Sequence, residues 1–233
     1  FTDGRTISFA SFTVDTQAVA ATLTTANATN LTDGGLAAKW TGNIGATAVV
    51  ADAALTTGDA WVSIIDNASI TTALFGAEGN FAHDVNIWAD SGEIRNIAGG
   101  AKSGGSVKAV NFIVGDDMTV TGKTFAGGQG SVEGAVRTLI SGGSFGDVVV
   151  AGTFSNRENT AVGNVELTID GGNFAGNAYG GSQVRYAAGK TNTVGSITVN
   201  LKDVDSVKTG FSIYAGGMAT GADSAKSANT YEV

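Results

Sequence analysis

The stretch that decides the fold is Val165-Glu166-Leu167-Thr168-Ile169-Asp170-Gly171-Gly172-Asn173-Phe174, which is followed by Tyr179-Gly180-Gly181. Apolar and polar residues alternate up to Ile169, which is the period of a β-strand with one buried face. A glycine pair then supplies a turn, and an apolar residue leads to a second glycine pair. Related units recur upstream and downstream, so the sequence predicts a repeat protein.

The last apolar residue before each turn serves as an anchor for comparing the repeats. Successive anchors lie 24 to 32 residues apart, a range typical of one structural repeat, at Ile65, Ala89, Val114, Ile140, Ile169 and Leu201, with Trp40 as a candidate for an earlier one. A second glycine site follows each turn, at Gly76, Gly99-Gly100, Gly127-Gly128, Gly152, Gly180-Gly181 and Gly216-Gly217. Because Val, Ile and Phe alternate without the apolar stripe of a helix, strands are favoured over helical solenoids of similar period.

The fold expected is all-β, a parallel β-helix or β-solenoid of about six or seven coils, with two or three strands in each coil. Residues 61 to 233 form the solenoid repeats, and residues 1 to 60 form an irregular N-terminal cap or strand region. Within that region, Thr6 to Val14 predicts a strand, whereas Asp15 to Asn27 fits either a short helix or another strand.

Composition excludes several classes of partner. The 233 residues include 35 Gly and no Pro, which suits internal strands that donate backbone N–H groups on both sides. A net charge of −8 argues against nucleic acid or an anionic membrane surface, because either partner requires a basic patch. No apolar run approaches the length of a membrane span. The absence of Cys excludes disulfides and Cys-ligated metal sites.

No residue pattern points to catalysis, so the chain is not expected to be an enzyme or to hold a cofactor. His83 is the only His, and a lone His cannot form a multi-His metal site. Thr121-Gly122-Lys123-Thr124 resembles the end of a phosphate-binding P-loop, but no helix signal follows it. Asp116-Asp117 is the best carboxylate pair, yet it occupies the position of the Gly-Gly and Ser-Gly turns in other coils, which favours a turn.

The tryptophans and the longer loops are the candidate binding surfaces. Trp61 is expected in the core, whereas Trp88 is expected to face outward. An outward Trp is a candidate contact surface for a glycan or a surface protein. The loops at residues 153–164 and 182–196 are longer than those of earlier coils, and such insertions often form the binding face of a solenoid.

The ends of the stack are the candidate assembly surfaces, because an open solenoid end exposes unpaired backbone. Asn229 to Val233 aligns with the beginning of the strand seen as Gly195 to Val199, so the sequence stops partway through a coil. Either the coils continue in a longer protein, or another subunit completes the half coil, for instance with its strand from Ile7 to Val14. The residues expected at such a joint are Ile7, Phe9, Phe12, Val14, Tyr231 and Val233.

The units Ile169-Asp170-Gly171-Gly172-Asn173-Phe174 and Tyr179-Gly180-Gly181 resemble the Gly-rich β-solenoid passenger regions of bacterial autotransporter and adhesin-like surface proteins. The resemblance covers residues 61 to 233 and implies an extracellular or cell-surface location, adhesion or scaffold roles, and no cofactor. With the open end, it suggests a structural extracellular protein that assembles with copies of itself, head to tail, into a filament or sheath. The alternative is an adhesin-type binding module that recognises a glycan or a surface protein through its loops.

Overall fold

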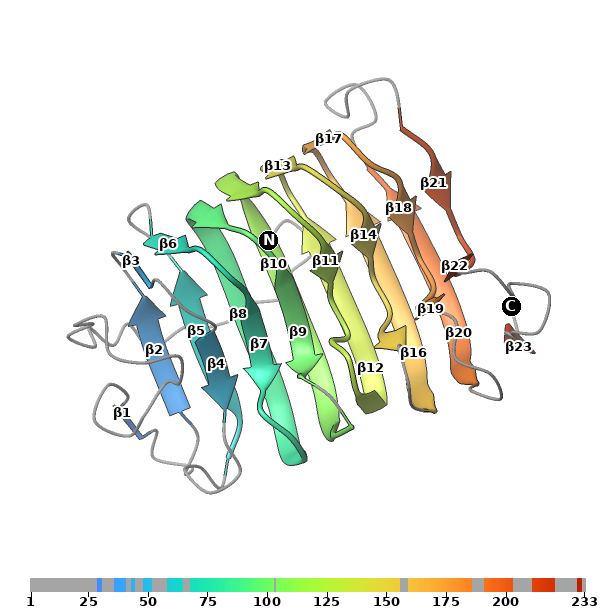
Figure 1. Cartoon of the computed structure of the whole chain (residues 1–233), viewed down its shortest axis with the longest axis horizontal. Coiled ribbons are helices and arrows are strands. Elements are labelled where there is room, and N and C mark those ends of the chain that lie inside the picture. The colour runs from blue at the N-terminus through green and yellow to red at the C-terminus, as the bar shows by residue number, and fades with distance from the viewer. Residues whose placement is uncertain are drawn as a thin grey trace.

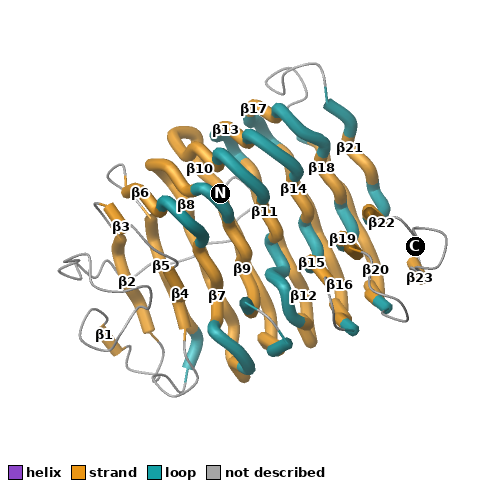
Figure 2. Tube along the Cα trace, in the orientation of Figure 1, coloured by secondary structure: helices purple, strands orange, loops and turns teal. Residues whose placement is uncertain are grey.

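The computed structural model of the chain is a parallel β-solenoid (Figures 1 and 2). It describes residues 29–30, 36–40, 43–44, 48–51, 58–64, 68–102, 104–155, 159–185, 191–202, 211–220 and 230–231, and all their regular structure is β. Between β5 (Ala60–Ile64) and β20 (Asn192–Leu201) the chain makes about five full turns, slightly fewer than the coils expected, because that expectation also counted the outer coils. Among the described residues, no helix is long and apolar enough to span a membrane.

The first sheet holds the longest strand of each turn. Its strands follow one another in the order β1 (Thr29–Asn30), β2 (Leu36–Trp40), β5, β8 (Phe81–Ile94), β10 (Ser106–Val120), β12 (Ser131–Ile140), β16 (Thr160–Ile169), β20 and β23 (Thr230–Tyr231). Neighbours on this path pair in parallel, except that β1 is antiparallel to β2. Past the bend the sheet also contains β3 (Asn43–Ile44), β6 (Ala68–Ile70), β13 (Ser144–Phe145) and β17 (Asn173–Phe174).

Two further sheets complete the coils. The second contains β4 (Ala48–Ala51), β7 (Leu74–Ala77), β9 (Ile97–Ala101), β11 (Thr124–Phe125), β14 (Val149–Val150), β18 (Ala178–Tyr179) and β21 (Ile213–Tyr214). The third contains β15 (Phe154–Ser155), β19 (Gln183–Arg185) and β22 (Met218–Thr220). The stretch from Val165 to Gly181 thus runs from the first sheet through the second. Regular stacking also extends upstream of residue 61, because β2, β3 and β4 pair in register with β5, β6 and β7.

The strand register confirms all the expected anchors but one. The residues that share one column are Trp40, Ile64, Ala89, Val114, Ile140, Ile169 and Leu201. The expected anchor Ile65 is therefore wrong by one residue, because two adjacent Ile fit the pattern equally well. A shift of one residue reverses the face to which every side chain of a strand points. Trp61 is accordingly half-buried between the buried Ala60 and Val62, rather than in the core.

The core lies between the sheets and is built from columns of inward side chains. In β8, β10, β12 and β16 the inward residues of the first sheet are all buried, namely Val85, Ile87, Ala89, Val110, Phe112, Val114, Val136, Thr138, Ile140, Val165, Leu167 and Ile169. Trp88 lies between two of them and faces outward, as expected. After the bend, the rings of Phe145, Phe174 and Phe211 stack with centroids 4.9 and 4.7 Å apart. This spacing matches that of neighbouring strands.

The second glycine sites pack against one another from coil to coil. A Cβ added to Gly76 would lie 1.8 Å from the carbonyl oxygen of Gly99, and one added to Gly99 would lie 2.2 Å from that of Ala126. Further along the rod, the N–H of Gly152 donates to the carbonyl oxygen of Gly181 at 3.0 Å. At Gly76 and Gly99 a carbonyl oxygen of the next coil thus occupies the space that a Cβ would take, so a residue with a side chain does not fit without a backbone shift.

We expect Gly76→Ala to lower the free energy of unfolding by about 1–3 kcal/mol, the usual cost of overpacking a rigid site. Gly79→Ala is the matched control, because a Cβ at Gly79 meets nothing within 4 Å. Urea denaturation followed by circular dichroism measures both variants. Equal stability of the two would contradict the role given to the close backbone approach.

Candidate functional site

In the last described coil, formed by β20, β21 and β22, the residues of the core columns are less buried than in the preceding coils. Leu201 and Tyr214 are 46% and 45% exposed, whereas Ile169, which precedes Leu201 in its column, is 1% exposed. The residues Ile197, Val199, Phe211 and Ile213 are only partly buried against the core. Tyr214 stacks on Tyr179 on one side, with ring centroids 4.9 Å apart. This coil therefore presents an apolar surface shaped by the same columns that fill the core.

Within the part of the chain that the structure describes, most of the outer edge of β20 also lacks a strand partner. Strand β20 pairs with β16 along its whole length. On its other edge, the described residues include only β23, which pairs in parallel with Thr193 and Val194. The edge from Ile197 to Leu201 therefore has no strand partner among the described residues, which makes it a candidate for strand addition.

Of the residues expected at an assembly joint, only Tyr231 lies in the described part of the chain. It pairs with Val194, three residues before the position expected from the sequence. The cause is that β20 begins at Asn192, whereas the apolar alternation of the sequence placed the beginning of this strand at Gly195. Ile7, Phe9, Phe12, Val14 and Val233 lie outside the described residues, as does the segment from Asp15 to Asn27.

The carboxylate pair Asp116-Asp117 lies at a bulge inside β10 rather than in a turn between strands. The register with β8 shifts between Val114 and Asp117, which marks the extra residue. Burial raises the pKa of the neighbouring Asp90, and the charges of Asp117 and Asp116 raise that pKa further. In the described part of the chain, no group of three or more acidic, His or Cys side chains could hold a metal ion.

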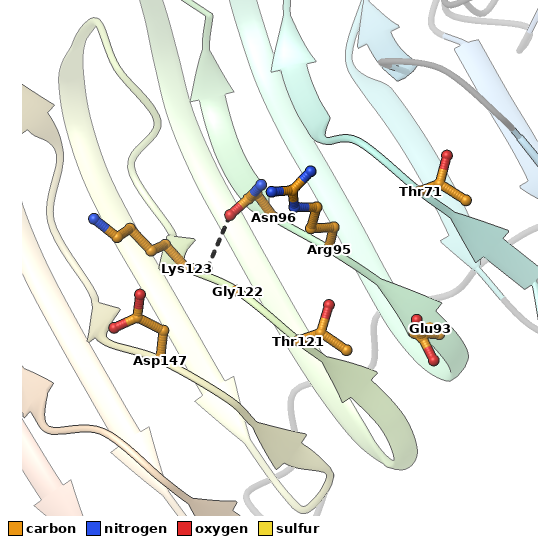
Figure 3. A pocket seen from close by; sticks show the side chains of 8 residues that line it. All are labelled: Thr71, Glu93, Arg95, Asn96, Thr121, Gly122, Lys123 and Asp147. Carbon is orange, nitrogen blue, oxygen red and sulfur yellow. Dashed lines mark hydrogen bonds between the residues drawn. The ribbon is translucent and has the colours of Figure 1, made fainter.

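A groove of about 420 Å³ follows the corner between the first and second sheets across several coils (Figure 3). Its lining residues are Thr71, Glu93, Arg95, Asn96, Thr121, Gly122, Lys123 and Asp147. Asn96 connects three coils here, because its Nδ2 donates to the carbonyl oxygen of Thr72 at 3.0 Å and its Oδ1 accepts from the N–H of Lys123 at 3.0 Å. The charged side chains of the lining are exposed and of both signs, which suits a polar ligand.

Sequence reasoning missed this groove and weighed Lys123 only as part of a P-loop. The structure excludes a P-loop, because residues 121–123 form the bend between β10 and β11 and no helix follows. The sequence did contain one signal for this corner, a polar residue directly before a strand of the second sheet. Asn96 shows it, and so does Asn177, whose Oδ1 accepts from the N–H of Ser212 at 3.0 Å.

A comparison of the chain with protein-family models, with curated proteins and with solved structures finds no match.

We expect Asp117→Asn to lower the pKa of Asp90, because it removes a like charge. Asp147→Asn, between β13 and β14, is the control and should leave the pKa of Asp90 unchanged. Carboxyl-carbon NMR titration measures the shift. Because the folded-state pKa of Asp90 is raised, its contribution to stability is lost as the pH rises through that pKa. An Asp90 that titrates identically in both variants would contradict the charge coupling.

Proposed function

We propose that this protein is an exported structural protein, located at the cell surface or outside the cell, whose β-solenoid subunits stack end to end into a filament or sheath. The observation that carries the proposal is the last described coil, where the edge of β20 from Ile197 to Leu201 has no partner among the described residues, and where Leu201 of β20 and Tyr214 of β21 are exposed. The resemblance of the repeat to autotransporter and adhesin-like passenger regions supports the location and the scaffold role.

Favourable association requires contacts across a whole coil at the joint, because the burial of two apolar side chains is not enough. Burying Leu201 and Tyr214 completely contributes at most about 3–6 kcal/mol. Association costs roughly 4–15 kcal/mol in lost translational and rotational freedom. Only the added backbone hydrogen bonds of a full strand, at about 1 kcal/mol each, together with the other columns of the coil, make stacking favourable.

Salt should promote the assembly. Each copy carries a net charge of −8, so two copies repel each other over the Debye length. Higher ionic strength screens this repulsion but leaves the apolar contacts and the backbone hydrogen bonds of the joint in place. Assembly driven mainly by ion pairs would show the opposite salt dependence.

We expect the full chain to form filaments in negative-stain electron microscopy, with a size distribution that grows with protein concentration and with salt. Leu201→Lys should abolish the filaments, because it places a charge on the stacking surface. Thr121→Lys makes the same charge change in the corner groove and should assemble normally. A monodisperse monomer at every concentration and salt would overturn the proposal.

The corner groove favours a second candidate function, an adhesin-type module that binds a glycan or a surface protein. Arg95 and Lys123 project their charged ends along one side of the rod, within reach of one extended polar ligand (Figure 3). On a glycan array, the double variant Arg95→Ala and Lys123→Ala should lose at least tenfold in affinity. Lys108→Ala, which removes a cation facing Asp84 elsewhere on the rod, is the control. Binding that depends on Trp88 instead would place the ligand on the outer face of the first sheet.

A further inference from the structure

We infer that the joint between two copies is one more coil-to-coil step in the existing register, in which β2 of the incoming copy pairs in parallel with β20 and its β4 pairs with β21. The inference rests on the proposed function and names the partner surface. It follows from the positions of these strands: β4 and β21 end the second sheet, and β2 and β20 each have only a two-residue strand, β1 or β23, beyond them in the first sheet as described.

Strands β2 and β20 are equivalent positions of the repeat in the first sheet, as β4 and β21 are in the second. Along the first sheet the register runs step by step from Trp40 in β2 to Leu201 in β20. Along the second sheet it runs from Ala48 in β4 to Ile213 in β21. A second copy translated along the rod therefore presents, at the open end, the strands that the next coil requires.

Strand β23 does not obstruct this joint. In the part of the chain that the structure describes, it occupies the edge of β20 only at Thr193 and Val194. The five residues of β2 match the five positions from Ile197 to Leu201, because Leu36 lies in the same column as Ile197. The joint is then a composite coil, in which β23 of one copy and β2 of the next lie end to end along the same strand.

Strand β1 controls access to the joint. It pairs antiparallel with Leu36 and Ala37, on the edge of β2 that the neighbouring copy needs. Among the described residues only two pair in this way, so β1 is easily displaced, while the positions from Ala38 to Trp40 can make the first contact. The joint uses two different surfaces of the chain, so it extends into a polar filament instead of closing a dimer.

Cysteine cross-linking tests the register without interference, because the chain has no Cys. Lys39 and Asn200 share one column, so the double variant Lys39→Cys and Asn200→Cys should place the two thiols side by side at every joint. Within one copy they are six strand steps apart, about 29 Å, which is far beyond the Cα separation of a disulfide. Mild oxidation should therefore yield a ladder of covalent oligomers on a non-reducing denaturing gel.

The double variant Ala38→Cys and Asn200→Cys is the control, because a shift of one residue points the thiol to the other face. It should yield less than a tenth of the cross-linked product. Filaments without a ladder from the first variant would overturn the register and leave the proposed function standing. Monomers without a ladder would overturn both. Equal ladders from the two variants would show random collision and overturn the register.

Discussion

The hydrogen bonds between neighbouring parallel strands fix the spacing of the strands, and the rest of the molecule depends on this distance. Side chains in one column repeat at the strand spacing, so each column must be filled by groups that pack well at that distance. The rings of Phe145, Phe174 and Phe211 do so by stacking, and the glycines at the second site do so by having no side chain. Asn96 and Asn177 extend the same step across the bend by accepting backbone N–H groups of the following coil. A substitution in one coil therefore affects the coil on either side.

Much of the fold follows from the sequence, because alternation is strict where both faces of a strand are well defined. The runs ending at Ile140 and Ile169 gave the inward residues and the register without ambiguity. Prediction failed where the pattern was locally degenerate, as at the adjacent Ile64 and Ile65, and where a strand begins with polar residues, as at Asn192. The corner groove was missed because Thr71, Thr121 and Asp147 are unremarkable within their own repeats, and only stacking brings them together with Asn96, the polar residue directly before β9.

Repetition also explains why the ends of the rod differ from its interior and are candidate sites of assembly. Inside the stack, inward side chains contact equivalent side chains on both sides and are fully buried. At the last described coil the same residue types are only partly buried, and their column neighbours among the described residues lie on one side. A surface that matches the interior of its own protein is best completed by another coil of the same kind. Solubility of a single copy then depends on how each end is covered, and at the end formed by β2 the proposed cover is β1.

The direction of the hydrogen bonds has a mechanical consequence. The bonds between coils point along the rod, whereas the covalent chain runs around it, so tension along the rod loads the coil boundaries in series. The weakest boundary opens first, and each opened coil releases 24 to 32 residues of chain. At about 3.4 Å per residue this is roughly 80–110 Å of extension, against about 4.8 Å of rod length lost. Such a rod would yield stepwise under load and dissipate a pull that would break a rigid tether.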